Sequence, residues 1–132
     1  MTLWRRAVVY GLVLWGVPFV VAVLSFSLRD DSRPLFESIM AVTVCATTVA
    51  LAVSYLGRIS KAFLRAGVLV GALWLAISIL LDAPLMLLGG PMQMTFGAYM
   101  ADIGVTYFMI PTITVGMGIL LRVQARARDT NE

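Results

Sequence analysis

Four long apolar blocks constrain the fold more than any other feature of this sequence. They span residues 7–28, 36–56, 66–88 and 96–121. An α-helix of about 20 residues crosses a membrane core of roughly 30 Å, and a helix satisfies its own backbone hydrogen bonds in lipid. Only 13% of the 132 residues are charged, against about 25% in soluble domains. We therefore predict an all-α integral membrane protein, a single domain of four transmembrane helices in an antiparallel bundle.

The positions of the cations predict the orientation of these helices. Most of the 10 Lys and Arg residues lie before the first block, between the second and third, or after the fourth: Arg5, Arg6, Arg58, Lys61, Arg65, Arg122, Arg126 and Arg128. Only Arg29 and Arg33 lie in the other two connections. Lys and Arg concentrate on the cytoplasmic side of membrane proteins. We therefore expect a multi-pass protein of a bacterial-type cytoplasmic membrane with both termini inside, and residues 122–132 as a polar cytoplasmic tail, disordered at its end.

Several other classes of protein fit this sequence poorly. The first block exceeds the apolar region of about 7–15 residues in a signal peptide, and no A-x-A site follows it, so we expect a retained helix. The net charge of +3 does not predict nucleic-acid binding, because the cations lie at the ends of apolar segments. The chain has no histidine, one cysteine and no phosphate-binding glycine loop. We expect no enzymatic activity, no metal and no cofactor.

Two aspartates mark the candidate functional region. Asp82 lies toward the end of the third block, and Asp102 lies early in the fourth. Hydrocarbon provides neither water nor counter-charge, so a carboxylate in or near it indicates a functional site or a specific partner. Counting about 1.5 Å per residue places both in the outer part of the membrane rather than at its middle. An alternative register places both deeper, and the sequence alone does not decide between the two. The candidate acidic site comprises Asp82, Asp102, Arg29, Arg33, Tyr99 and Thr106.

A structural and a transport interpretation of this site both remain open. In the structural interpretation, the acids pair with Arg29 or Arg33 and accept hydrogen bonds from nearby hydroxyl groups of Tyr99, Thr95 or Tyr107. This structural interpretation predicts that replacing Asp82 by asparagine lowers the stability of the fold, because the arginine would lose its partner. In the transport interpretation, a partly buried carboxyl group binds a proton or another cation.

The same region also contains a group of methionines, namely Met86, Met92, Met94 and Met100. Thioether sulfur favours Cu(I). Methionine also fills irregular apolar gaps, and this explanation needs no metal. We therefore predict no metal site.

Small residues in the second and third blocks predict contacts between helices. Ala41, Cys45 and Thr48 recur at spacings of three and four, and Gly67 and Gly71 form a GxxxG motif. Small side chains let helices approach closely in lipid, where packing drives association. The second block should therefore pack against another helix, and the third should cross a neighbouring helix or a second copy closely. In the fourth block, Pro111 should produce a kink, because it lacks a backbone N–H.

In length and expected spans, the chain resembles the small multidrug transporters in outline. The glutamate in the first helix of that family has no counterpart between Ala7 and Leu28. A shared outline does not establish a function. The preferred prediction is an accessory or interaction subunit with an outer-side acidic cluster, surrounded by the lipid bilayer, in a homo-oligomer or a larger membrane complex. The alternative is a small oligomeric proton- or cation-coupled transporter that uses Asp82 and Asp102.

Overall fold

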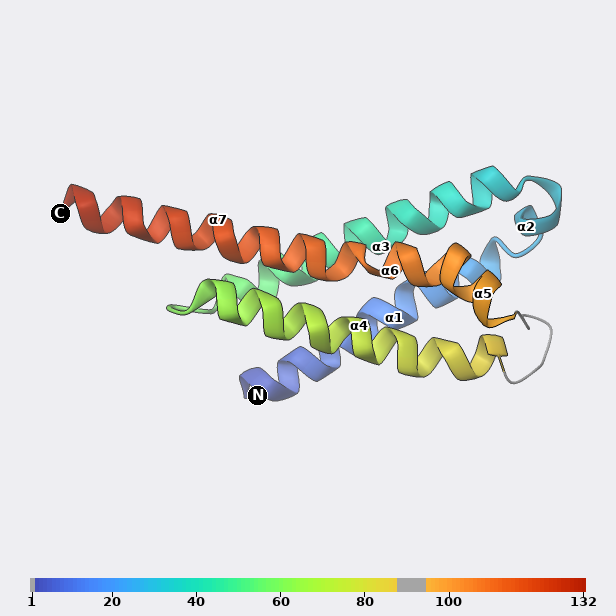
Figure 1. The fold of residues 1–132 in the computed structure, drawn as a ribbon, viewed down its shortest axis with the longest axis horizontal. Helices are drawn as coiled ribbons and strands as arrows, with labels where there is room; N and C mark the ends of the chain where they lie inside the picture. Colours follow the sequence, from blue (N-terminus) through green and yellow to red (C-terminus); the bar gives the residue numbers. More distant parts are fainter. Residues whose placement is uncertain (1, 88–94) are drawn as a thin grey trace.

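The computed structural model describes residues 2–87 and 95–132, and these residues form a series of helices (Figure 1). The elements are α1 (Leu3–Leu24), α2 (Leu28–Asp31), α3 (Arg33–Leu56), α4 (Phe63–Leu87), α5 (Phe96–Tyr99), the π-helical turn η1 (Met100–Gly104), α6 (Val105–Tyr107) and α7 (Met109–Asn131). Four segments are helical, long and apolar enough to cross a membrane: Leu3–Leu24, Arg33–Leu56, Phe63–Leu85 and Val105–Asn131. The prediction of an all-helical chain with four such segments is confirmed.

The long helices pack against one another in a bundle. α4 makes its most extensive contact with α7 and also packs against α1, while α3 contacts α1 and α7. Both termini lie toward one end of the long axis, together with the connection between α3 and α4 (Figure 1). The short elements α2 and α5 lie toward the other end (Figure 1). The two ends of the bundle therefore differ in the segments that form them. α4, which carries Asp82, and α5, which carries Tyr99, meet near the end that contains α2.

The C-terminal tail differs from its prediction. Residues 122–132 were expected to be a polar tail with a disordered end, whereas α7 continues as a helix to Asn131. Gly118 is the last glycine or proline before the end of the chain, and the exposed turns contain Ala125, Ala127 and several arginines. Alanine and arginine are strong helix formers. Helix propensity therefore extends α7 beyond its apolar part.

The fourth apolar block is divided into several pieces rather than forming one regular helix. α6 ends at Tyr107, and the N–H of Phe108 bonds to the carbonyl of Val105 in a tighter turn before α7 begins. Pro111 explains this break, because it has no N–H to offer the carbonyl of Tyr107. On the other side of α6 lies η1, a turn of the kind that often occurs at functional sites. The irregular segment 96–108 carries Tyr99 and Tyr107.

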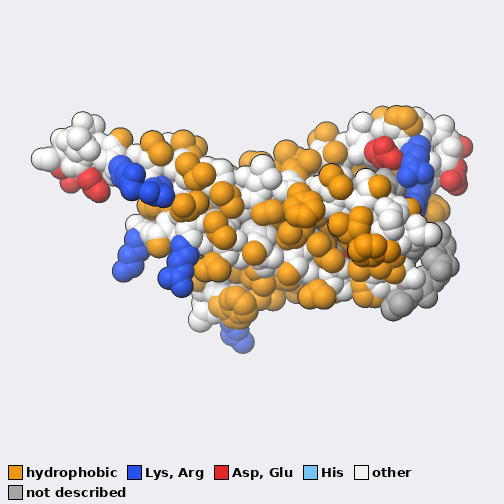
Figure 2. All heavy atoms as spheres, in the orientation of Figure 1, with side chains coloured by type: hydrophobic (Ala, Val, Ile, Leu, Met, Phe, Trp, Pro, Cys, Tyr) orange, Lys and Arg blue, Asp and Glu red, His pale blue; other side chains and the backbone are white. Residues whose placement is uncertain are grey.

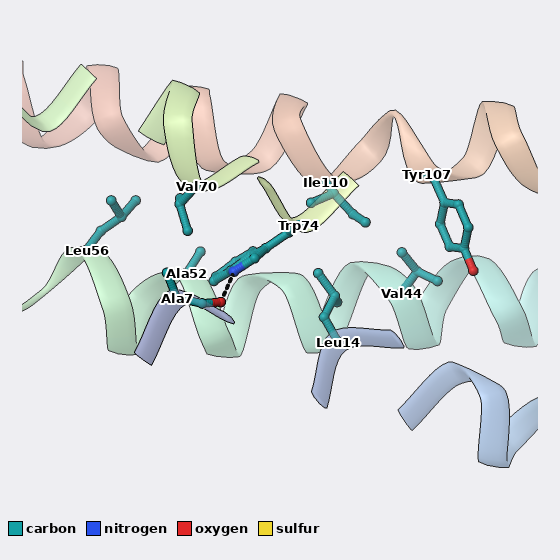
Figure 3. Packing of buried hydrophobic residues seen from close by; sticks show 9 residues of the cluster. All are labelled: Ala7, Leu14, Val44, Ala52, Leu56, Val70, Trp74, Tyr107 and Ile110. Carbon is teal, nitrogen blue, oxygen red and sulfur yellow. Dashed lines mark hydrogen bonds between the residues drawn. The ribbon is translucent and has the colours of Figure 1, made fainter. Parts of the chain in front are cut away.

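The core is centred on Trp74 of α4, whose side chain is fully buried. Its indole N–H donates a hydrogen bond of 2.9 Å to the carbonyl oxygen of Ala7 in α1 (Figure 3). Every long helix contributes to the buried apolar cluster around it, which comprises Ala7, Leu14, Val44, Ala52, Leu56, Val70, Trp74, Tyr107 and Ile110 (Figure 3). Trp74 therefore joins α1 to α4 by packing and by a directional bond.

The small residues of α3 lie partly on its packing face. The buried positions of this helix are Val44, Thr48, Ala52 and Leu56, at a regular spacing of four. Thr48 thus lies on the packing face, and its hydroxyl donates to the carbonyl of Val44 at 2.6 Å. Ala41 and Cys45 are only half-buried, because they lie beside this row rather than on it.

The GxxxG motif of α4 lies against α7 of the same chain. A Cβ atom added to Gly67 would collide with the carbonyl oxygen of Thr114, and one added to Gly71 would collide with the hydroxyl of the same threonine. From the other side, a Cβ on Gly118 of α7 would lie 2.7 Å from the carbonyl oxygen of Phe63. Three glycines therefore allow α4 and α7 to approach at backbone distance.

Replacing Gly67 by alanine should destabilise the bundle by about 1–3 kcal/mol, because the rigid backbone of α7 must move away. The matched control is Gly116→Ala on α7, where nothing lies within 4 Å of the added atom. That variant should be neutral or more stable by about 0.5–1 kcal/mol, because alanine favours a helix interior over glycine. Unfolding of both variants in detergent micelles measures the difference. Equal stabilities would contradict the close approach of α4 and α7.

Candidate functional site

A cavity of about 520 Å³ lies between α1, α3, α4 and the segment from Ala101 to Tyr107. Its size falls within the range of about 300–1,000 Å³ that is common for small-molecule sites. The walls are mainly apolar and rich in aromatic rings, contributed by Trp15, Phe19, Phe26, Phe36 and Tyr107. The rings of Trp15 and Phe19 stack with their centroids 4.8 Å apart. The cavity can therefore hold an organic molecule against flat apolar surfaces.

Asp82 provides a carboxyl group in the wall of this cavity, and its side chain is only 4% exposed. The hydroxyl of Tyr107 donates a hydrogen bond of 3.0 Å to its Oδ2 atom. The hydroxyl of Tyr99 lies 3.5 Å from the same oxygen, a longer and weaker bond. Because both hydroxyls reach one oxygen, they orient the carboxyl group and hold it at the cavity wall.

Local helix geometry explains how these three side chains meet. Asp82 follows Ser78 and Trp74 at a spacing of four, so it continues the buried face of α4. Tyr99 and Tyr107 are eight residues apart, and about 100° per residue would leave them about 80° apart on a regular α-helix. The wider turn of η1 lies between them and reduces this offset. The π-helical turn thus helps to aim both hydroxyls at Asp82.

Trp15 adds an unused hydrogen-bond donor to the site. Its Nε1 atom is buried and has no hydrogen-bond partner within the described parts of the chain. The indole N–H lies near the Asp82 carboxyl group but outside hydrogen-bond geometry. A buried donor without a partner costs free energy.

The arginines do not neutralise Asp82. Arg29 lines the same cavity, but among the residues that the structure describes neither Arg29 nor Arg33 forms an ion pair with Asp82. Arg33 pairs instead with Glu37, one helical turn later, at 2.9 Å on the exposed surface. The expectation that an arginine pairs with Asp82 is therefore wrong. Arg33 pairs with a closer acid on its own helix, whereas the expected hydrogen bonds from Tyr99 and Tyr107 to Asp82 are present.

Other residues of the predicted site can be placed only in part. Thr106 lines the cavity beside Tyr107. The side chain of Asp102 lies outside the described residues, so its place in the acidic site stays a prediction. The same holds for most of the methionine group, because Met92, Met94 and the side chain of Met86 also lie outside them. Within the described residues, no group of three or more His, Cys, Asp or Glu side chains is placed to hold a metal ion.

Sequence reasoning missed the wall of the site that comes from α1. Trp15, Phe19 and Phe26 lie in the first apolar block, which hydropathy identifies only as a membrane span. The spacing of four puts Trp15 and Phe19 on one face of α1, and Phe26 follows in the turn after Leu24. That periodicity of aromatic residues is the signal that could have identified this face. Its relation to Asp82, more than 50 residues away in sequence, comes only from tertiary packing.

This arrangement combines a buried acid, hydroxyl donors and aromatic walls in a single cavity. A carboxylate can hold a proton or the positive group of a ligand, and aromatic faces attract cations through their negative π surfaces. No family model, curated protein or solved structure matches this chain. The chemistry of this cavity is therefore the feature that indicates a function.

Proposed function

We propose that this chain is an integral protein of a bacterial-type cytoplasmic membrane, with four antiparallel spans forming one domain and both termini inside. The four long apolar helices support this placement. Apolar side chains cover the middle of the molecule, whereas Lys, Arg, Asp and Glu lie toward its ends (Figure 2). The excess of cations at the end that contains both termini supports the orientation.

Reporter fusions test this topology. Alkaline phosphatase, which is active only after export, should be inactive when joined to either end of the chain. The same enzyme inserted between Asp31 and Arg33, in the connection proposed to be outside, provides the positive control. Activity at either terminus would overturn the proposed orientation.

Within this membrane domain, we propose that the cavity binds a small aromatic organic cation and exchanges it for a proton, as in a small carrier. One observation carries this proposal: the carboxyl group of Asp82 is buried in an apolar interior without a cationic partner among the described residues. A buried charge is costly unless it is paired. A cation bound from outside the chain provides the missing partner, and a proton provides it when the cation leaves.

The burial of Asp82 at the cavity wall favours a cation over an anion there. The charged or titratable side chains that line it are Asp82, Glu37, Arg29 and Tyr107, with Tyr99 also facing Asp82. Glu37 is neutralised by its pair with Arg33. The carboxyl group of Asp82 lies at the cavity wall and is almost fully buried, whereas Arg29 is only half-buried. A positive group beside Asp82 gains charge pairing, and the aromatic side chains that line the cavity can add cation–π attraction.

An accessory or interaction role, alone or in a larger complex, stays a prediction. The exposed apolar side chains that could contact a partner protein are also those that lipid would cover. The described surface therefore does not indicate a protein partner, whereas the cavity and Asp82 indicate a ligand. The cation-binding function is accordingly the better supported of the two.

Titration calorimetry of the purified protein with phenyltrimethylammonium tests the cation site. Benzenesulfonate is the matched control, because it carries the same ring with the opposite charge. The cation should bind, and the sulfonate should bind at least about tenfold more weakly, a difference of about 1.4 kcal/mol. Acidification should weaken cation binding, because a proton neutralises Asp82. Equal binding of the two compounds, or no binding of the cation, would refute the proposal.

A further inference from the structure

A second hollow lies at the opposite end of the bundle from Asp82. It is an open cleft of about 660 Å³ between the connection that precedes α4, the first turn of α4 and the C-terminal half of α7. The charged residues of its lining are Lys61, Arg65, Arg122, Arg126 and Asp129. Four of these side chains are cationic and one is acidic, so the cleft is strongly positive. It shares no residue with the cavity around Asp82.

Close helix packing creates this concentration of charge. Gly118 lets the backbone of α7 approach Phe63 and Leu64 at the start of α4. Arg122 follows one turn after this contact, and Arg65 lies in the first turn of α4 on the other side of the cleft. Cations from two helices therefore face one space. Among the described residues, none of the four cations of the cleft forms an ion pair.

The cleft also lies at the boundary between apolar and polar surface. Phe63 and Leu64 are half-buried in its apolar part. Beyond the cleft toward the middle of the bundle, the exposed side chains are large and apolar: Val68, Leu69, Ile119 and Leu120. In the other direction, α7 continues as a polar helix to Asn131. A molecule seated here would contact guanidinium groups at one end and apolar side chains at the other.

We propose that this cleft binds the headgroup of an anionic glycerophospholipid. The phosphodiester would lie between the guanidinium groups of Arg65 and Arg122, which suit the geometry of phosphate oxygens. The acyl chains would extend along the apolar surface between α4 and α7. This inference rests on the membrane placement in the proposed function but not on cation binding at Asp82, so either can fail without the other.

Lipid titration of the purified protein in detergent, followed by native mass spectrometry, tests this site. The probes are phosphatidylglycerol, zwitterionic phosphatidylcholine of the same acyl chains, and glycerol 3-phosphate. Phosphatidylglycerol should bind at least tenfold more tightly than either of the others, because only it combines a net negative phosphodiester with acyl chains. Equal binding of phosphatidylcholine would overturn the charge argument. Equal binding of glycerol 3-phosphate would overturn the assignment to a lipid.

Paired variants separate the cleft from the general positive charge of this end. The double variant Arg65→Gln/Arg122→Gln should weaken phosphatidylglycerol binding by about tenfold or more, because it removes both guanidinium groups that would contact the phosphodiester. Arg58→Gln/Arg128→Gln is the matched control, because it removes two cations outside the cleft and should change binding less than twofold. Lys61→Gln/Arg126→Gln provides a second cleft variant if the first does not fold. Equal losses of phosphatidylglycerol binding in the cleft variants and the control variant would refute a specific lipid site in the cleft.

Discussion

The Asp82→Asn variant is expected to bind phenyltrimethylammonium about tenfold to 150-fold more weakly than the wild type while it stays folded. A hydrogen bond or contact to a charged group contributes about 1.5–3 kcal/mol, which corresponds to this change in Kd. Asparagine has nearly the same shape as aspartate and keeps an oxygen that can accept from Tyr107. Calorimetry of the two proteins under identical conditions measures the difference.

The stability of this variant distinguishes the two interpretations of Asp82. The structural interpretation of the sequence predicts that Asp82→Asn loses stability, because it assumes that the aspartate pairs with an arginine. In the structure the partners are the hydroxyls of Tyr107 and Tyr99, so asparagine should change the free energy of unfolding by less than about 1 kcal/mol. Asp30→Asn, at an exposed position in α2, is the matched control for loss of one negative charge. Unchanged cation binding in Asp82→Asn would show that the cavity does not use this carboxyl group.

Trp74→Ala is expected to destabilise the protein by about 3–5 kcal/mol, more than Gly67→Ala or Asp82→Asn. The side chain is fully buried at the contact of α1 and α4. Its removal would leave a cavity where the ring of Tyr55 now packs at a centroid distance of 6.2 Å. It would also remove the hydrogen bond to the carbonyl of Ala7. Unfolding in mixed detergent micelles measures this loss.

Two further variants identify the cause of the lower stability of Trp74→Ala. Trp4→Ala removes the same side chain where it is 67% exposed, and it should change stability by no more than about 0.5 kcal/mol. Trp74→Phe keeps an aromatic ring but lacks the N–H, so its stability should fall between those of the two alanine variants. A Trp74→Ala protein as stable as Trp4→Ala would contradict the packing of α1 on α4.

Much of the fold is predictable because lipid compatibility is a local property. A run of about 20 apolar residues satisfies the length and backbone requirements of a span without reference to the rest of the chain. This is why the number and type of the long helices agree with the sequence. The position of Pro111 likewise indicated a break in the fourth block, because the missing N–H acts on the preceding turn. The residues at which the helices end were less predictable, since α7 continues past Leu121 because of helix propensity.

The candidate site was only partly predictable, because its chemistry depends on side chains that are distant in sequence. Asp82 could be singled out from its type and position, and Tyr99 was among the expected donors. The prediction of an arginine partner for Asp82 was wrong, because charge alone does not determine whether Arg33 reaches Asp82 or the nearer Glu37. Trp15 was missed, because an aromatic residue in an apolar span looks the same whether it faces lipid or a cavity.

By itself, the sequence determined that this chain forms long apolar helices with cations gathered at one end, because hydropathy and charge act over single segments. Only the tertiary structure decided which faces meet. The glycines of α4 bring α7 to backbone distance, and the π-helical turn helps to aim Tyr99 and Tyr107 at one oxygen of Asp82. Those contacts depend on helix rotation and register, which are fixed by packing between segments and are not encoded in any one of them.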